Sequence, residues 1–302
     1  MSVLVFGSLN MDVVFRCDQM PKPGETVLCP SYTTGPGGKG LNQAVAARRA
    51  GSEIHLVGAI GSDGYGSEME RFLVSEGISC DGLQKFQDAA TGIAHIAVDH
   101  AGENSIIVAS GANGAITGWC GTEKQAAVWL AQLELSPAAV AEFFRAGRSL
   151  GAICMLNAAP AIAAGTELFP LCDIIVVNEH ELADYAGAAC DPDLPDSLSQ
   201  AAGKVADLER QVLIVTLGAR GTQVFGSSGT YFVPAMKITP CDTTGAGDCF
   251  CGVLADGLAS GLEVVDAVRR ANAAAAIAVQ RDGAALAMPL ASEIAVFQSN
   301  VA

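Results

Sequence analysis

Short apolar runs alternate with longer stretches of helical periodicity along most of the chain. The apolar runs are near-continuous, as in strands buried on both faces, and occupy residues 3–6, 54–59, 127–133, 152–157, 174–178 and 212–217. Helical patterns follow at 41–50, 66–76, 137–146, 179–186 and 198–208, and two more lie at 246–259 and 263–280. This alternation predicts a mainly parallel sheet with helices on both faces.

Two segments depart from this alternation. Residues 15–34 contain the turn-rich "PKPGET" between short extended pieces, and residues 91–108 have the pattern of a β-hairpin with a polar tip. We expect insertions at about 11–36 and 91–109 to form a small separate sheet that covers a cleft as a lid. Because no long linker divides residues 1–302, a single α/β domain carrying this lid is predicted.

Composition narrows the class of protein. The 302 residues carry a net charge of −15 and half of them are hydrophobic, which excludes a disordered chain and argues against nucleic-acid binding through clustered Lys and Arg. No apolar run approaches the roughly 20 residues that span a bilayer, and the N-terminus has the pattern of a strand rather than a signal peptide. The ten cysteines are scattered without a CxxC pair. We therefore expect a cytoplasmic protein with reduced thiols that acts on small molecules and does not contact membranes.

Polar side chains follow several predicted strands. Asn10 and Asp12 come after the first strand and are two residues apart, so they project to one side if the chain stays extended. Glu134 and Asn178 end two other strands, and Glu181 follows shortly after. Ligands of parallel sheets bind beyond the carboxyl ends of the strands, where these groups would meet. Each residue alone is equally compatible with an ordinary turn.

The segment "GGKGLNQAVAARR" begins a predicted helix with two glycines. Gly37 and Gly38 remove side chains where the backbone turns, and Lys39 and Asn42 then fall three apart on one helix face. An ammonium and an amide beside glycine N–H groups suit a polyhydroxylated ligand. The alternative is a simple glycine turn with a solvated lysine and a helix-surface asparagine.

A second glycine-rich turn, "DTTGAGDCFCG", leads into the helix predicted at 246–259. Unpaired N–H groups and the positive end of the helix dipole make such a turn an anion site. Asp248 stands in the first turn of that helix, either as a cap or as a participant in chemistry. The nearby "TLGARG" at 216–221 is compatible both with a hairpin turn and with a close approach to nucleotide phosphates.

Together, these segments resemble the ribokinase family of sugar kinases over essentially the whole chain. The resemblance is carried by "GSLNMD" (7–12), "PGETV" (23–27), "GGKGLNQAVAA" (37–47), "GENSIIVASGAN" (102–113), "QLE" (132–134), "NEHE" (178–181), "TLGARG" and "DTTGAGD" (242–248). The order and spacing of these motifs are specific, although each alone is not. The resemblance implies a ribokinase-like three-layer α/β/α domain with a mainly parallel central sheet and a small β-sheet lid.

The resemblance also implies a reaction. ATP would donate its γ-phosphoryl group to a primary sugar hydroxyl, O5 of D-ribose, to give D-ribose 5-phosphate. Asp248 would be the catalytic base, and Gly245, Ala246 and Gly247 the anion hole for the transferring phosphoryl group. Two alternatives remain open: a related kinase for another furanose, such as deoxyribose or fructose, or for a nucleoside, and a sugar-binding sensor without turnover.

The remaining roles are implied by position in the family motifs. The sugar ligands would be Asn10, Asp12, Gly38, Lys39, Asn42 and Glu134. The ATP site would include Asn178, Thr216, Gly218, Gly221 and Asn272, with Glu181 organising Mg²⁺ through water. An activating K⁺ would be held by Asp242, Thr244, Ala278, Arg281, Gly283 and Ala287, the last through its carbonyl alone. The resemblance further implies a homodimer formed through the lids.

Overall fold

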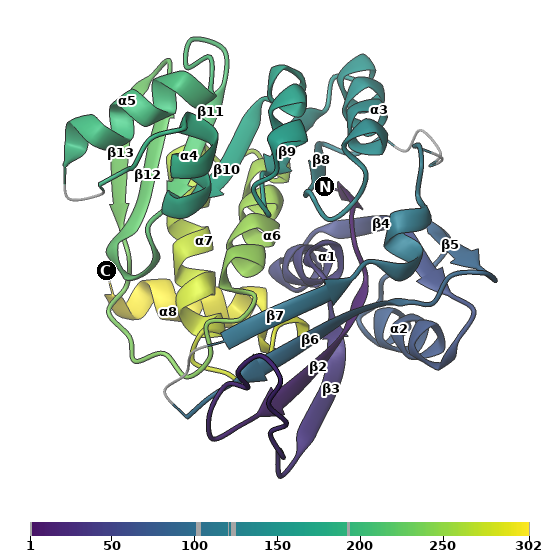
Figure 1. Ribbon diagram of the computed structural model, residues 1–302. Coiled ribbons are helices and arrows are strands. Elements are labelled where there is room, and N and C mark those ends of the chain that lie inside the picture. The colour runs from purple at the N-terminus through teal and green to yellow at the C-terminus, as the bar shows by residue number, and fades with distance from the viewer. Residues whose placement is uncertain (1, 101–103, 120, 122–124, 192–193, 302) are drawn as a thin grey trace.

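A large, mostly parallel sheet forms the centre of the computed structural model, which describes residues 2–100, 104–119, 121, 125–191 and 194–301. Its order in these residues is β13-β12-β11-β10-β9-β8-β1-β4-β5 (Figure 1). The bounds are β1 Ser2–Phe6, β4 Glu53–Gly61, β5 Leu83–Phe86, β8 Val128–Ala131, β9 Ile153–Asn157, β10 Ile174–Asn178, β11 Val212–Thr216, β12 Gly221–Gly226 and β13 Gly229–Pro234. Every pairing from β11 to β5 is parallel, whereas β12 and β13 add an antiparallel edge.

Helices cover both faces of this sheet (Figure 1). On one face lie α3 Pro137–Ser149, α4 Glu179–Ala186 and α5 Pro195–Val205, and on the other lie α1 Lys39–Ala50, α2 Gly64–Ser75, α6 Ala246–Ala259, α7 Val264–Ala278 and α8 Ala291–Val301. Along β1, Val3 and Val5 pack with the α1 and α6 side, while Leu4 and Phe6 pack with the α3 side. This alternation of fully buried side chains explains the near-continuous apolar strands, and the predicted three layers are confirmed.

The predicted strands and helices are all present, with small shifts at their ends. The helix expected at 198–208, for example, is α5, which begins and ends three residues earlier. Three elements lacked a clear pattern: β5, β13 and α8. β5 and β13 are the two edge strands of the sheet and hold few buried side chains, so no continuous apolar run marks them.

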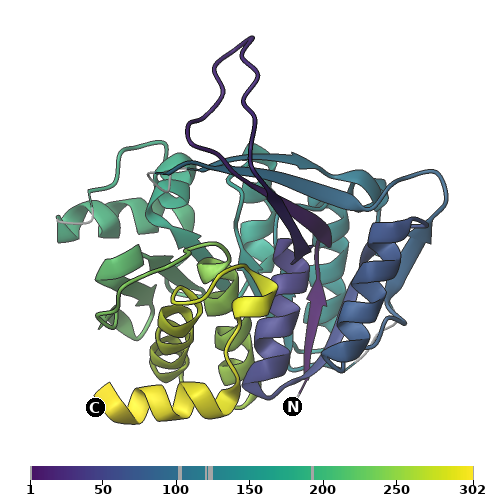
Figure 2. The ribbon, with the colours of Figure 1, turned by 90° about the horizontal axis from the view of Figure 1, so that it is seen from below.

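A second sheet of order β3-β2-β6-β7 crosses one end of the molecule (Figure 2). Its strands are β2 Asn10–Arg16, β3 Tyr32–Gly37, β6 Gly92–Val98 and β7 Asn104–Ala109, and β2 pairs with β6 in parallel but with β3 in antiparallel orientation. Residues 101–103, at the tip of the predicted hairpin, lie outside the described residues. Figure 2 shows the connection between β2 and β3 projecting away from the body of the molecule. Because β2 follows β1 after three residues, its first residues stand between the two sheets.

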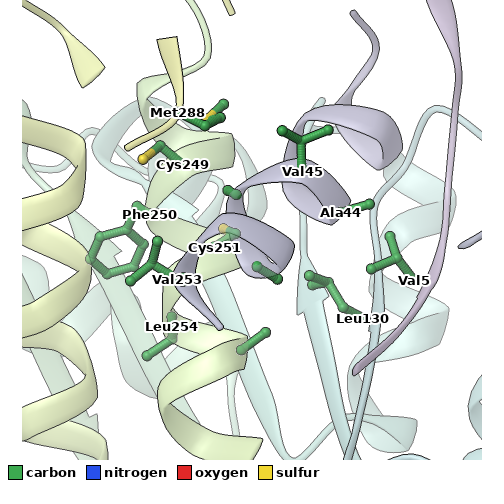
Figure 3. Close-up of a cluster of buried hydrophobic side chains, with 14 of the residues drawn as sticks. Val5, Ala44, Val45, Leu130, Cys249, Phe250, Cys251, Val253, Leu254 and Met288 are labelled. Carbon is green, nitrogen blue, oxygen red and sulfur yellow. The ribbon is translucent and has the colours of Figure 1, made fainter. Parts of the chain in front are cut away.

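Helices α1 and α6 pack closely because small residues line their contact. A Cβ atom on Gly252 would lie 2.4 Å from the carbonyl oxygen of Gln43 and 2.6 Å from the Cβ of Ala46. Figure 3 shows Ala44 of α1 and Cys251 of α6 among the side chains of the apolar cluster that these helices share. This close approach brings the start of α1 beside the first turn of α6, one turn before Gly252.

No disulfide joins the cysteines of the described residues. Burial raises the pKa of several of them, including Cys249 and Cys251, so these thiols stay protonated. Among the described helices, none combines the length and hydropathy needed to cross a bilayer.

Candidate active site

A pocket of about 220 Å³ opens where three parallel strands end. It is lined by Asn157 at the end of β9, Asn178 at the end of β10 and Thr216 at the end of β11. Lys39, Glu181 and the first turn of α6, including Asp248, also line it. Three larger hollows exist in the described residues. One of about 500 Å³ beside Leu28 gathers no charged side chain, and those of about 290 and 370 Å³ have charged lining residues but lie at the amino ends of strands. Converging polar groups at the carboxyl edge of the sheet mark the smaller pocket as the candidate site.

Asp248 is the central side chain of this site. It occupies the third position of α6 and is only 7% exposed. Asn42 Nδ2 donates a hydrogen bond to its Oδ2 at 2.9 Å, and Gln43 Nε2 donates to its Oδ1 at 2.9 Å. The side chain makes no capping bond to its own helix, whose N-cap is Gly245. The alternative of a helix cap is therefore excluded, and a buried carboxylate faces the pocket.

The turn before α6 places backbone N–H groups beside the same pocket. Gly245 adopts φ 74°, a left-handed conformation that favours glycine, and a Cβ atom on Gly247 would meet no atom within 4 Å. The N–H of Ala246 already donates to the carbonyl of Thr243 at 3.2 Å. Among the three predicted anion-hole residues, Ala246 thus contributes to the turn itself, while the positive end of the helix dipole points at the pocket.

Charged groups crowd together beside Asp248. Burial and the nearby carboxylates of Glu134 and Asp248 raise the pKa of Asp12 to about 7. Burial alone would lower the pKa of Lys39, but attraction to Asp248, Glu134 and Glu181 outweighs it and raises that pKa above its ordinary value. Lys39 is therefore a firmly protonated cation among carboxylates, and Asp12 is a carboxyl group that titrates near neutrality.

The start of α1 packs closely against the connection between β1 and β2. Gly38 caps the helix with φ 89°, and a Cβ atom there would lie 2.7 Å from the backbone N of Asn10. Glu134 accepts a hydrogen bond from Ser8 and a longer one, 3.4 Å, from the N–H of Lys39. Within the described residues, Asn42 Oδ1 is buried without a hydrogen-bond partner. A buried acceptor of this kind is costly unless a ligand donates to it.

Asn113 holds Asn10 in place, a role that no motif of the sequence predicts. Its Nδ2 donates to Asn10 Oδ1 at 2.9 Å and to the carbonyl of Leu9 at 3.0 Å, while its Oδ1 accepts from the Leu9 N–H at 3.1 Å. Gly92 permits this contact, since a Cβ atom there would lie 2.2 Å from Asn10 Oδ1. Asn113 is the last residue of "GENSIIVASGAN", a segment already quoted for the family resemblance. Its place in that segment is the sequence signal that could have pointed to it.

The predicted nucleotide residues divide into two groups. Asn178 and Glu181 form a capping box at the start of α4: Asn178 Oδ1 accepts from the Glu181 N–H at 2.8 Å and Glu181 Oε2 accepts from the Asn178 N–H at 2.8 Å. Both line the pocket with Thr216, and burial raises the pKa of Glu181. Gly218, Gly221 and Asn272 do not line it.

Gly218 and Gly221 form the turn between β11 and β12, with φ 54° and 128°. The structure thus contains the hairpin turn that was one of the two interpretations of "TLGARG". Asn272 of α7 accepts from the Thr222 hydroxyl at 2.8 Å and donates to the Val233 carbonyl at 3.3 Å. It therefore fastens the β12–β13 hairpin to α7.

Two of the predicted cation residues, Thr244 and Gly283, contact Asp242. Its Oδ1 accepts from the Thr244 N–H at 2.9 Å and its Oδ2 from the Gly283 N–H at 3.0 Å. Partial burial would raise the pKa of Asp242, but these hydrogen bonds lower it overall. The Ala278 carbonyl accepts from the Arg281 N–H at 3.0 Å, and the Ala287 carbonyl from the Arg281 guanidinium at 3.5 Å. Asp242 thus offers a carboxylate held by Thr244 and Gly283, whereas the Ala278 and Ala287 carbonyls are engaged by Arg281.

Three buried amides behind Asp248 were also missed. Gln43 Nε2 donates to Asn157 Oδ1 at 3.0 Å as well as to Asp248, and Gln132 Nε2 donates to Gln43 Oε1 at 2.6 Å. Gln43 and Gln132 lie inside two of the quoted motifs, "GGKGLNQAVAA" and "QLE", but neither stands at a position to which the resemblance gives a role.

Comparison with known proteins places this geometry in context. The model of the pfkB family of carbohydrate kinases matches residues 1–291. The chain is 34% identical over 306 residues to the ribokinase of Schizosaccharomyces pombe (97% of this chain, 96% of the relative) and 32% identical over 295 residues to the deoxyribokinase of Salmonella typhi (96% of each). Among solved structures, that of Arabidopsis thaliana ribokinase complexed with ribose and ATP superposes with a TM-score of 0.90 at 28% identity, covering 98% of each chain.

Proposed function

Because this chain belongs to the pfkB family of carbohydrate kinases, we propose that it transfers the γ-phosphoryl group of ATP to O5 of D-ribose. The relatives named ribokinase span nearly the whole chain, and the Arabidopsis structure was solved with ribose and ATP. The observation that carries the proposal is the buried carboxylate of Asp248, fixed by two amide donors at the N-terminus of α6 and facing the pocket that Lys39 lines.

Asp248 is the base in this proposal. Its carboxylate removes the proton of the attacking hydroxyl while the sugar oxygen bonds to the γ-phosphorus and ADP leaves. Phosphoryl transfer relies mainly on positioning and on stabilising charge on the equatorial oxygens. The N–H groups of Gly245 and Gly247, the dipole of α6 and the ammonium of Lys39 supply that positive potential.

The sugar lies on the side of Asp248 that faces the small sheet. Asn10, Asp12, Gly38, Asn42 and Glu134 offer amides, carboxylates and a close backbone approach to a hydroxylated ligand. The unpartnered Oδ1 of Asn42 is the acceptor best placed to receive a sugar hydroxyl. The nucleotide occupies the other side, against Asn178, Thr216 and the turn of Gly218 and Gly221, with Asn272 behind the neighbouring hairpin.

Two metal ions fit the residues present. Glu181 and Asp248 both line the pocket of about 220 Å³. Mg²⁺ is commonly bound by carboxylates through water, so Glu181 would help to hold it there, and the ion would neutralise phosphate charge when bound with ATP. Asp242, Thr244 and Gly283, with the carbonyls of Ala278, Arg281 and Ala287, would hold K⁺ beside the turn that leads into α6. Comparing turnover in K⁺ and in Na⁺ tests the second site, because indifference to the cation would exclude it.

We also propose that the small sheet is a lid and the contact surface of a homodimer in the cytoplasm, where ATP is available. β7 is an edge strand of that sheet, and Ile107 on it is 73% exposed; Tyr32 on the opposite edge strand is 64% exposed. Exposed apolar side chains on open edges favour association with a second sheet. Measuring the molar mass in solution by light scattering decides between monomer and dimer.

A sugar panel tests the proposed substrate. Steady-state kcat/KM is measured for ribose, 2-deoxyribose, fructose and adenosine by ADP release. We expect ribose to exceed 2-deoxyribose by at least about tenfold, because a site that hydrogen-bonds a hydroxyl discriminates strongly against its loss. A higher value for 2-deoxyribose would favour the second candidate, to which the similar Salmonella deoxyribokinase lends support. Ribose binding without ADP release would instead indicate a sensor.

A further inference from the structure

We propose that Gln43 is a positioning residue that fixes the carboxylate of Asp248 for proton transfer. The inference rests on the proposed role of Asp248 as the base. Gln43 is fully buried, 0% exposed, and its Nε2 donates to Asp248 Oδ1 at 2.9 Å. It therefore contacts the base without access to the sugar, unlike its neighbour Asn42, whose amide holds the other oxygen.

The Gln43 amide can take only one orientation. Its NH₂ group donates to Asp248 Oδ1 and Asn157 Oδ1, and its Oε1 accepts from Gln132 Nε2 at 2.6 Å. A 180° flip would set an amide oxygen against two acceptors and an NH₂ group against a donor. Both N–H bonds and the carbonyl are thus engaged in a buried network, where unmatched polar groups are costly. The donor that faces Asp248 is locked in place.

The network connects the base to the rigid centre of the fold. Gln132 directly follows β8 and Asn157 ends β9, two adjacent parallel strands of the central sheet. Gln43 lies on α1 and Asp248 on α6, so the chain of amides runs from the sheet through one helix to the other. A base supported in this way cannot rotate away from the acceptor hydroxyl, and small misplacements of reacting groups cost large factors in rate.

The network also predicts that Asn42 and Gln43, which both donate to Asp248, affect the kinetic constants differently. Asn42 belongs to the proposed sugar site as well as to Asp248, so its loss should affect the KM for ribose and kcat together. Gln43 contacts Asp248 but cannot reach the ligand, so its loss should lower kcat and leave both KM values nearly constant. A residue that only stabilises the fold would produce no such separation.

The test uses Gln43→Met, which keeps a side chain of similar length but removes the amide. We expect kcat to fall about 10–100-fold, with the KM for ribose and for ATP within about threefold of the parent. Gln132→Met is the matched control, since it removes a buried amide of the same network without touching Asp248. Its melting temperature should fall comparably, but its kcat should fall at least about fivefold less. Equal kcat losses in the two variants would overturn the proposal.

Two further variants keep the experiment decisive. Gln43→Asn withdraws the amide by one methylene and serves if Gln43→Met does not fold; an unchanged kcat for Gln43→Asn contradicts the proposal.

A double variant gives a second test. In an Asp248→Asn background, adding Gln43→Met should change the residual kcat less than about twofold, because the two residues act as one unit. A full additional loss there would indicate a structural role. If Asp248→Asn alone keeps normal turnover, the proposed base fails, whereas normal turnover of Gln43→Met alone refutes only the positioning role.

Discussion

At the scale of single residues, the site is governed by negative charges that share a small volume. Besides burial, the charges of Glu134 and Asp248 raise the pKa of Asp12. Lys39 is the cation that Glu134, Glu181 and Asp248 share. The crowding is useful to a kinase because a sugar arrives with hydroxyl donors and ATP arrives with metal ions. The crowding also contributes to the raised pKa of Asp12, about 7, so the protonation state of this residue changes near neutral pH.

The pH dependence of ribose binding should follow Asp12. Its pKa of about 7 means that the carboxylate, which accepts hydroxyl hydrogen bonds best, predominates above pH 7. The KM for ribose should therefore fall several-fold between pH 6 and pH 8. In Asp12→Asn the KM should be higher and nearly independent of pH in this range, as steady-state measurements at fixed ATP will determine.

The same shift predicts an opposite trend in stability. Between an unfolded pKa near 4 and the folded value of about 7, the native state binds the extra proton, so the contribution of Asp12 to stability falls as pH rises through this window. Asp12→Asn should consequently raise the melting temperature at pH 8 more than at pH 5, measured by calorimetry. A larger gain at pH 5 would show that the assigned direction is wrong.

At the scale of elements, the contact between α1 and α6 brings the amides of Asn42 and Gln43 to Asp248, the proposed base. Both helices could be predicted from their periodicity, and the glycine turns that begin them could be read from the sequence. Their crossing could not, because it depends on which small residues face each other across more than 200 positions of chain. For the same reason the roles of Gln43, Gln132 and Asn113 could not be predicted from the sequence. An amide within a helix or after a strand shows no functional pattern until its distant hydrogen-bond partner is known.

Gly252→Ala tests that contact directly. The new methyl would lie 2.4 Å from the Gln43 carbonyl oxygen, so α1 and α6 must move apart. We expect a loss of about 1–3 kcal/mol in the free energy of unfolding and at least about a tenfold fall in kcat, because the shift displaces the donors to Asp248. Chemical denaturation and steady-state kinetics measure the two effects.

Gly203→Ala is the matched control for this substitution. Gly203 lies in α5, and a Cβ atom there would meet nothing within 4 Å. Alanine should therefore stabilise that helix by about 0.4–1 kcal/mol without changing kcat. If both variants kept parental turnover, the close packing of α1 against α6 would have no part in catalysis.

At the scale of the whole molecule, the chain sets two sheets at an angle around one active site. The alternation of strands and helices predicted the large sheet and its two helical layers, because buried parallel strands leave continuous apolar runs. The turn-rich segment and the hairpin pattern pointed to a second sheet, but not to the parallel pairing of β2 with β6, which joins residues about 80 positions apart. That pairing sets Asn10 opposite Gly92 and Asp12 opposite Ala94, so a strand of the small sheet carries two residues of the proposed sugar site.

We propose that the two sheets and the helices α1 and α6 together place one carboxylate, that of Asp248, against a sugar hydroxyl. Asp248→Asn keeps the shape of the side chain and removes the base. We expect kcat for ribose to fall roughly 10²–10⁴-fold while ribose affinity, measured by calorimetric titration, stays largely unchanged. Turnover equal to that of the parent enzyme would contradict it.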